Sequence, residues 1–317
     1  MRIAVLGVGS IGGVVLGALC DTDVDLVAVS RGGLAANLAE IGLILHTPEG
    51  TIEMIPPERF IVVDSGAGPV SGQVRGTCEA AIICGKAAST SVLAQLAEEL
   101  LVDDGVAVSI QNGLGHSETL AHRLGRERVL GGSITHAAWR DSEETVHWVG
   151  RGSVRLGALD GGRPMGHAAR LLNALEEAGL DAIWCEDVGR VEWRKLLLNV
   201  AINPVCAIAG VRNGALLEIP ELWEQGLAAM NEAASVARAS GVDLGDVDLA
   251  DHLRKVAEAT AENRCSMLQD VMAGRATEID SLCGAVVERG EAGGIPTPAN
   301  QALHALVKGI ERSPEFS

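Results

Sequence analysis

A glycine-rich segment near the N-terminus is the feature that most constrains how this chain folds. Residues 2–6, Arg-Ile-Ala-Val-Leu, read as a short buried strand, and Gly-Val-Gly-Ser-Ile-Gly follows at once over 7–12. Residues 11–20 are predicted to form a helix, and the apolar run 24–30 a second strand. A GxGxxG sequence that ends a strand and opens a helix, within a β–α–β unit of about 30 residues, is typical of a dinucleotide-binding domain.

The three glycines of this segment suit a phosphate-binding turn. They permit a tight turn after the strand, close approach of a pyrophosphate, and packing of the helix on the strand. The start of the helix then offers free N–H groups and the positive end of its dipole to the phosphates. The alternative is a glycine-rich turn in an α/β protein that binds no nucleotide, and the strand–turn–helix context favours the nucleotide.

The residue after the second strand distinguishes between the two nicotinamide cofactors. A site for NAD places Asp or Glu there, to bind the ribose hydroxyls. This chain has Ser30-Arg31 instead, which puts a positive charge where a 2′-phosphate would lie. The sequence therefore favours NADPH/NADP, with a surface arginine that binds no ligand as the alternative.

Strand and helix patterns alternate through the first part of the chain. Further strands are expected at 80–84, 105–110 and 128–134, with a helix near 91–101. Two short strands around a Gly-Arg-Gly turn are then expected within 144–159, followed by a helix at 164–179 and a strand at 182–185. Such alternation favours a parallel, doubly wound sheet.

The pattern changes near residue 186, where strand runs cease. Helical periodicities continue from there at 189–203, 220–241, 246–262, 265–291 with interruptions, and 298–311. The sequence thus predicts an α/β protein with two domains. A Rossmann-type NADP-binding domain is expected over residues 1–186, and an all-α substrate and catalytic domain over residues 187–317.

Composition excludes several classes of partner. The formal net charge of −17 argues against nucleic acid or an anionic membrane surface, because both require basic surface. The seven cysteines show neither a CxxC pair nor a metal-ligand spacing, so we expect reduced core residues and no metal site. Without a secretory signal or a long apolar run, the chain is expected to be soluble and cytoplasmic, with a small-molecule partner. A homo-oligomer stays open.

An unusual polar stripe occurs in the apolar segment Glu-Trp-Arg-Lys-Leu-Leu-Leu-Asn-Val-Ala-Ile-Asn-Pro of residues 192–204. At about 100° per residue, side chains four positions apart lie on one face of a helix, so Lys195, Asn199 and Asn203 share a stripe. Buried amide and ammonium groups are costly unless something satisfies them. A lysine that extends to solvent and asparagines that bind other helices are the structural alternative. The stripe is also compatible with a substrate site.

Longer motifs resemble the ketopantoate reductase (2-dehydropantoate 2-reductase) family over nearly the whole chain. The matching segments are GVGSIGG (7–13), GK (85–86), QNGLG (111–115), THAAWRD (135–141), EWRKLLLNVAINPVCAI (192–208) and NRCSMLQDVMAGRATEID (263–280). The first is shared by many dinucleotide enzymes, whereas the last two are highly specific together. The resemblance implies an oxidoreductase that acts on a CH–OH group, reducing 2-dehydropantoate to D-pantoate with NADPH in pantothenate and coenzyme A biosynthesis.

The resemblance also implies roles for individual residues. Lys195 would be the proton donor. Substrate would be bound by Asn199, Asn203, Asn213, Asn263, Ser266 and Glu278. The cofactor would be bound by Gly7, Val8, Gly9, Ser10, Ile11, Gly12, Arg31, Lys86, Asn112, Ala138 and Glu278. A lysine among leucines suits proton donation, because burial brings its pKa down toward neutrality while a carboxylate such as Glu278 holds its charge.

Two alternatives remain open at this level. One is a reductase of the same fold that uses NADPH on another 2-oxo acid, and the other is a non-catalytic NADP-binding sensor. The chain has no tyrosine and two phenylalanines, so its pocket walls are expected to be unusually aliphatic. Arg264 and Cys265 also precede Ser266 where small polar residues are typical. Both departures bear on the identity of the substrate more than on the reaction. The absence of tyrosine also excludes a Tyr–Lys proton-donor pair.

Overall fold

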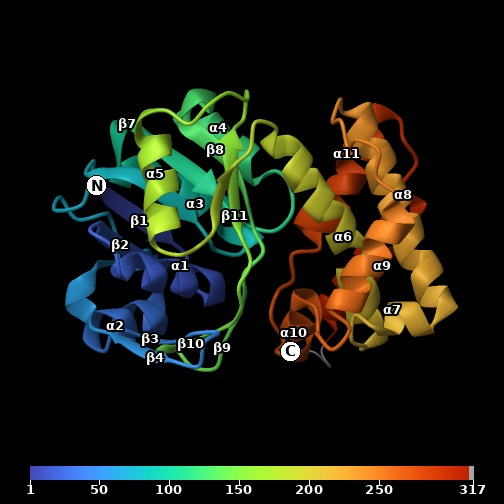
Figure 1. Cartoon of the computed structure of the whole chain (residues 1–317), viewed down its shortest axis with the longest axis horizontal. Coiled ribbons are helices and arrows are strands. Elements are labelled where there is room, and N and C mark those ends of the chain that lie inside the picture. The colour runs from blue at the N-terminus through green and yellow to red at the C-terminus, as the bar shows by residue number, and fades with distance from the viewer. Residues whose placement is uncertain (314–317) are drawn as a thin grey trace. The chain divides into compact units, whose positions relative to one another are not determined.

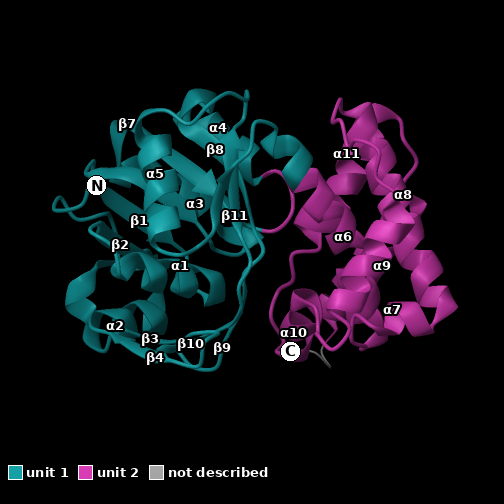
Figure 2. Ribbon diagram, viewed as in Figure 1, with its two compact units in different colours: residues 1–111, 116–191 teal, residues 112–115, 192–317 magenta. Residues whose placement is uncertain are grey.

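The computed structural model describes residues 1–313, which fold into two compact units (Figures 1 and 2). Unit 1 comprises Met1–Gln111 and His116–Val191, and unit 2 comprises Asn112–Gly115 and the chain from Glu192 onward. The chain therefore enters unit 2 briefly at Asn112, returns to unit 1 at His116, and finally leaves unit 1 within helix α6 (Val188–Ala209). Each unit has its own apolar core.

Unit 1 is built on an eight-stranded sheet with the strand order β12-β11-β8-β7-β6-β1-β2-β5. The strands are β1 (Arg2–Leu6), β2 (Asp25–Ser30), β5 (Ile61–Asp64), β6 (Cys78–Ile83), β7 (Leu101–Ser109), β8 (Val129–Ile134), β11 (Val154–Ala158) and β12 (Ala182–Trp184). Strand β1 lies between β2 and β6 and runs parallel to both, as the predicted β–α–β unit requires. The dinucleotide-binding fold expected from the sequence is confirmed.

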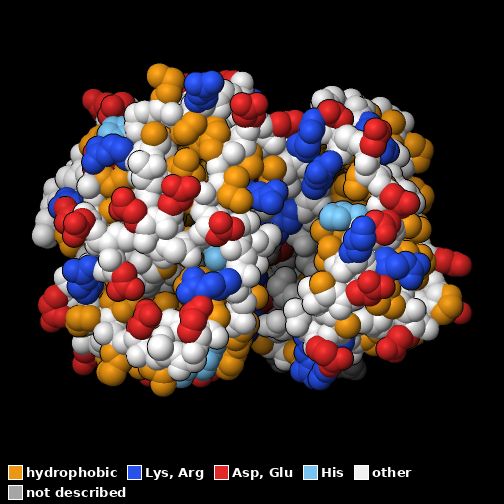
Figure 3. Space-filling model, viewed as in Figure 1, with side chains coloured by type: hydrophobic (Ala, Val, Ile, Leu, Met, Phe, Trp, Pro, Cys, Tyr) orange, Lys and Arg blue, Asp and Glu red, His pale blue; other side chains and the backbone are white. Residues whose placement is uncertain are grey.

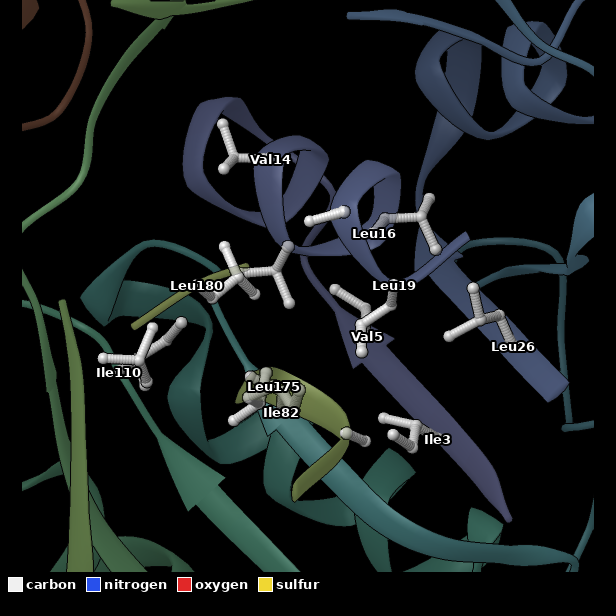
Figure 4. Close-up of a cluster of buried hydrophobic side chains, with 14 of the residues drawn as sticks. Ile3, Val5, Val14, Leu16, Leu19, Leu26, Ile82, Ile110, Leu175 and Leu180 are labelled. Carbon is white, nitrogen blue, oxygen red and sulfur yellow. The ribbon is translucent and has the colours of Figure 1, made fainter. Parts of the chain in front are cut away.

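Helices cover both faces of this sheet. In β1, Ile3 and Val5 face the cluster that contains α1 (Ser10–Cys20) and α5 (Gly166–Glu177). Figure 4 draws them in one cluster with Leu16, Leu19 and Leu175. Ala4 and Leu6 point the opposite way, into a cluster with α3 (Thr90–Leu100) and α4 (His116–Leu124). Successive strand residues point to opposite faces, so a strand that is apolar throughout is buried on both.

One expectation for this sheet is wrong in part. The sheet is mixed, because β11 pairs antiparallel with β8 while β12 runs parallel to β11. No helix connects β8 to β11; the chain instead passes through two strands of another sheet and returns in the opposite direction. The two strands expected around the Gly-Arg-Gly turn both exist, as β10 (Thr145–Gly150) and β11, but they belong to different sheets.

A second, four-stranded sheet in unit 1 was not expected from the sequence. Its order is β4-β3-β10-β9, formed by β3 (Leu43–His46), β4 (Ile52–Ile55), β9 (Ala137–Arg140) and β10. Glycines let α1 approach this sheet closely. A Cβ on Gly13 would meet the Val146 side chain at 2.7 Å, and one on Gly17 would meet the Leu45 side chain at 2.8 Å. The α1 glycines outside the fingerprint therefore serve packing.

The described part of unit 2 after Glu192 is helical. Its helices are α6, α7 (Ala215–Glu218), α8 (Pro220–Ala239), α9 (Leu249–Ala259), α10 (Ser266–Met272), the π-helical turn Asp280–Gly284, α11 (Ala285–Gly293) and α12 (Pro298–Arg312). Helix α6 continues through Pro204 to Ala209, whereas the sequence pattern placed its end at residue 203. Buried neighbours on both sides of Pro204 hold this last part of the helix in the core. The segment 265–291, expected to be helical with interruptions, is broken after α10 at Gly274, which has a φ of +62°.

The surface charge, the helices and the potential metal ligands of the described residues bear on the classes of partner considered above. On the face drawn in Figure 3, acidic and basic side chains of unit 1 are interspersed. None of the helices in the described part of the chain has the length and apolar run that crossing a bilayer requires. Within residues 1–313, no group of His, Cys, Asp and Glu side chains is arranged to hold a metal ion. All seven cysteines are free, and only Cys84 and Cys185 are not fully buried.

Candidate functional site

The glycine segment between β1 and α1 forms a turn that tolerates no side chain at two of its three glycines. Gly7 has a φ of +90°, and a Cβ there would lie 2.5 Å from the Cα of Gly85. A Cβ on Gly12 would lie 2.2 Å from the carbonyl oxygen of Gly7. Gly9 differs, because a Cβ there would meet nothing within 4 Å. The turn is thus closed on its inner side and open at Gly9.

The N-terminus of α1 has the features of an anion site. Gly9 is its N-cap residue, no side chain caps the helix, and the first turn contains no acidic residue. The first N–H groups of a helix have no partner within the helix and carry the positive end of its dipole. The turn therefore fits the phosphate groups of a dinucleotide.

Other residues expected at the cofactor lie on loops and strands of unit 1. Arg31 is exposed between β2 and α2 (Gly32–Glu40), and Lys86 is exposed shortly after β6. Gly85 is packed against Gly7, which brings the start of this second loop to the glycine turn. Ala138 is half-buried on β9, opposite Trp148 of β10.

Lys195 lies in the middle of α6, half-buried among leucines. Burial lowers the pKa of its ammonium from 10.5 to about 8, and the negative charge of Glu278 opposes this shift. Because burial disfavours a charged group and a nearby carboxylate favours it, the net shift means that desolvation dominates. Lys195 consequently holds a proton that it can release near neutral pH.

Glu278 is buried and joins two segments of unit 2. Its Oε2 atom accepts a hydrogen bond of 3.0 Å from Nδ2 of Asn112. The Asn112 carbonyl in turn accepts a bond of 3.1 Å from Oγ of Ser281. Glu278 thus lies close enough to act on Lys195 electrostatically and also contacts Asn112, three residues that the resemblance assigns to one site.

Asn199 follows Lys195 by one helical turn and carries a polar atom without a partner. Its Nδ2 atom is buried and makes no hydrogen bond in the described structure. An unsatisfied buried amide costs about 1–3 kcal/mol, so such groups are rare in proteins unless a ligand satisfies them. Asn203, one turn further, is buried as well. The polar stripe expected from the sequence therefore exists on α6.

The remaining expected substrate residues lie near the far end of α6. Asn213 is buried, and its Nδ2 atom donates a hydrogen bond of 3.0 Å to Oγ1 of Thr260. The backbone N–H of Asn213 donates to the carbonyl of Asn263, also at 3.0 Å. The Oδ1 atom of Asn213 is buried without a hydrogen-bond partner. Ser266 is exposed at the first position of α10, and the side chain of Asn263 is exposed nearby in sequence.

Several residues that support these groups were missed at the sequence level. Cys265 is the N-cap of α10: its sulfur accepts the N–H of Leu268 at 3.4 Å and donates to the Asn203 carbonyl at 3.5 Å, which ties Ser266 to α6. Gln111 donates from Nε2 to the Gly85 carbonyl at 2.6 Å. These bonds link segments that are distant in sequence, so no local pattern predicts them. The only signal in the sequence was a polar residue adjacent to a residue that the resemblance assigns to the site.

The arrangement in unit 2 matches the needs of carbonyl reduction. An ammonium with a lowered pKa can stabilise negative charge on an oxygen and then transfer a proton to it. Amide groups one turn apart can orient a small acid without adding charge. Unit 1 separately offers a turn suited to phosphates.

Comparison with known proteins assigns both parts of the chain consistently. The family model described as ketopantoate reductase PanE/ApbA matches residues 3–161, and the model of the C-terminal part of the same family matches residues 187–311. A 2-dehydropantoate 2-reductase of Archaeoglobus fulgidus is 40% identical over 226 residues, which cover 71% of this chain and 74% of that protein. One of Halobacterium salinarum is 32% identical over 314 residues, which cover 98% of this chain and 99% of that protein.

Solved structures agree with this result. A PanE/ApbA family ketopantoate reductase from Ralstonia eutropha is 30% identical, with a TM-score of 0.86 and 98% coverage of both chains. D-mandelate dehydrogenase, solved with NADH and anilino(oxo)acetate, has a TM-score of 0.87 at 24% identity, again with 98% coverage of both chains. At this identity the second likeness shows a shared fold only.

Proposed function

This chain belongs to the ketopantoate reductase family, and from that membership we propose that it reduces 2-dehydropantoate to D-pantoate with NADPH, in the cytoplasm. In this proposal residues 1–186 hold the cofactor and residues 187–317 supply the substrate-binding and proton-donating groups. The observation that carries the proposal is the half-buried Lys195, whose pKa is lowered to about 8 beside the carboxylate of Glu278.

The residues of unit 1 fit NADPH. Gly7, Val8, Gly9, Ser10, Ile11 and Gly12 would hold the pyrophosphate, since the turn is open at Gly9 and the helix start carries no carboxylate. Arg31 and Lys86 would meet the 2′-phosphate, for which a pair of cations on exposed loops is suited. Ala138 is the further cofactor contact expected in unit 1, whereas the expected contacts Asn112 and Glu278 belong to unit 2. When bound, NADPH supplies the hydride that the carbonyl carbon of the 2-oxo acid accepts.

Lys195 would provide the proton. Negative charge grows on the carbonyl oxygen as its carbon is reduced, and an ammonium positioned there lowers the barrier by about 3–5 kcal/mol, the equivalent of a hundred- to several-thousandfold in rate. The proton then passes from the Lys195 ammonium to that oxygen, which leaves a neutral amine and a hydroxyl group. Partial burial makes this transfer easier, because it weakens the hold of Lys195 on its proton.

Glu278 and the polar residues would orient the reacting groups. Glu278 keeps the Lys195 ammonium protonated before the reaction, and Asn112 fixes the Glu278 carboxylate through its 3.0 Å hydrogen bond. The unpaired Nδ2 of Asn199 is a donor suited to the substrate carboxylate or hydroxyl. The other expected substrate contacts are Asn203, Asn213, Asn263 and Ser266.

A panel of 2-oxo acids tests the substrate. Oxidation of NADPH is followed by absorbance with 2-dehydropantoate, pyruvate, 2-oxoisovalerate and phenylglyoxylate, and each is repeated with NADH. We expect the highest kcat/KM for 2-dehydropantoate with NADPH. Turnover of other acids only would replace the pantoate assignment by a reductase of another 2-oxo acid. Tight NADPH binding without turnover of any acid would identify a sensor.

A further inference from the structure

Arg140 connects the second sheet of unit 1 to the glycine turn. It lies at the end of β9, far in sequence from the turn, and is half-buried. Its Nη2 atom donates to the carbonyl oxygens of Val8 at 3.1 Å and Gly9 at 3.4 Å. Its Nη1 atom donates to the carbonyls of Ser142 and Glu143, so one guanidinium joins the turn between β9 and β10 to the turn before α1.

These contacts fix the orientation of peptide groups in the turn. In a planar trans peptide, the C=O and the following N–H point in opposite directions. A guanidinium that holds the Gly9 carbonyl on its own side therefore directs the N–H of Ser10 away from β9. The Gly9 carbonyl also accepts the N–H of Gly13 at 2.9 Å, and the Gly9 N–H donates to the Gly7 carbonyl at 2.8 Å. The peptide planes on both sides of Gly9 are thereby held.

The position of the guanidinium is equally restricted. A Cβ on Gly13 would lie 3.2 Å from Nη2 of Arg140, so the helix backbone packs directly against the donor. Burial lowers the pKa of Arg140 to about 10, while the nearby carboxylates of Asp141, Glu143 and Glu144 act to raise it. The guanidinium is still charged near neutral pH.

We infer that Arg140 is a positioning residue of the dinucleotide site, which holds the carbonyls of Val8 and Gly9 so that the N–H groups at the start of α1 face the phosphates. The inference rests on the proposed function in one respect, the binding of NADPH at this turn. It adds a residue of the second sheet to the determinants of cofactor affinity.

Binding measurements on matched arginine variants test the inference. Arg128 is the control, since it is also half-buried and also donates to two backbone carbonyls, those of Gly105 at 2.9 Å and Val102 at 2.8 Å. NADPH affinity is measured by fluorescence titration, and thermal unfolding shows that each variant is folded. We expect Arg140→Met to raise the Kd for NADPH about ten- to hundredfold, because the charged hydrogen bonds to the Val8 and Gly9 carbonyls are lost. Arg128→Met should change it less than about twofold.

Two further measurements separate positioning from general destabilisation and from charge. Adenosine 2′-phosphate lacks the pyrophosphate, so its affinity should be the same in Arg140→Met as in the wild type. Arg140→Lys keeps the charge but lacks the forked donors, and should remain well below wild-type affinity for NADPH. In turnover, the KM for NADPH should rise by a larger factor than kcat falls.

The positioning role would be overturned if folded Arg140→Met bound NADPH as tightly as the wild type, or if Arg140→Met and Arg128→Met lost the same affinity. It would also be overturned if Arg140→Met lost as much affinity for adenosine 2′-phosphate as for NADPH, or if Arg140→Lys bound NADPH with wild-type affinity. If the wild-type protein did not bind NADPH, the same titration would overturn the proposed function, which is a different outcome from the failure of the positioning role.

Discussion

Asn112 and Glu278 lie 166 positions apart in sequence and share a 3.0 Å hydrogen bond from Nδ2 to Oε2. The bond belongs to a set of contacts that hold the segment after β7 within unit 2, including the 3.0 Å bond from the Leu114 N–H to the Ser281 carbonyl. Gly113 makes this possible, because a Cβ there would lie 2.4 Å from the same carbonyl oxygen. A residue assigned to the cofactor thus orients the carboxylate that acts on Lys195.

The pH dependence of the reaction should report the pKa of Lys195. Reduction needs the ammonium form, so kcat/KM for 2-dehydropantoate should be constant at low pH and fall as the pH rises through about 8. Oxidation of D-pantoate needs the neutral amine and should rise through the same range. Steady-state rates in both directions, between about pH 6 and pH 10, check this. Profiles that move in the same direction would contradict it.

Removal of the Glu278 charge should shift this profile to lower pH. The carboxylate raises the pKa of Lys195, so Glu278→Gln leaves burial unopposed and lowers that pKa further. We expect the falling limb for reduction to begin at a lower pH than in the wild type. Glu288→Gln, at an exposed position of α11, is the control and should leave the profile in place. A limb that stays or moves upward in Glu278→Gln would disprove the coupling.

Replacement of Asn199 should separate stability from activity. The Nδ2 atom of Asn199 is buried without a partner, so Asn199→Leu removes an unsatisfied amide from α6. We expect the Tm to stay the same or to rise by about 2–4 °C, whereas the KM for 2-dehydropantoate rises about tenfold or more. Calorimetry and steady-state kinetics measure the two effects. The control is Asn231→Leu, at an exposed position of α8, which should leave the KM for 2-dehydropantoate unchanged. If Asn199→Leu lowered the Tm and left this KM unchanged, Asn199 would have a structural role instead.

Much of the fold and part of the site follow from local sequence. The β–α–β unit of residues 2–30 was predicted because its elements are contiguous and their periodicities are clear. Lys195, Asn199 and Asn203 were placed on one face because helical geometry alone determines that relation. One of the interruptions expected within 265–291 lies at Gly274, where glycine adopts a left-handed φ at little cost.

The parts that were missed depend on pairing between distant segments. Strand β3 pairs with β10 about a hundred residues later, and neither strand is long enough for its alternation to identify a second sheet. The antiparallel orientation of β11 was not predicted, because the residue composition of a strand does not indicate whether it runs parallel or antiparallel to its neighbour. Capping by Cys265 and the bonds from Arg140 to the glycine turn likewise arise only once the chain has folded.

Arg31 should determine the preference for NADPH over NADH. It is exposed directly after β2, where its guanidinium can bind a 2′-phosphate that NADH lacks. We expect Arg31→Ala to raise the Kd for NADPH about tenfold or more and to change the Kd for NADH little. Titration with both cofactors, with Arg155→Ala at an exposed position of β11 as the control, provides the comparison. Equal effects on both cofactors would show that no phosphate is bound there.

The turnover number of Lys195→Ala tests the central claim most directly, because proton donation by that ammonium is the step on which the assignment depends. The exposed Lys255, paired with Asp251 on α9, offers Lys255→Ala as a control for the loss of a lysine. With 2-dehydropantoate and NADPH at saturation, we expect kcat to fall about a hundred- to ten-thousandfold in Lys195→Ala while the Kd for NADPH stays near the wild-type value. Wild-type turnover in a folded Lys195→Ala protein would contradict the account.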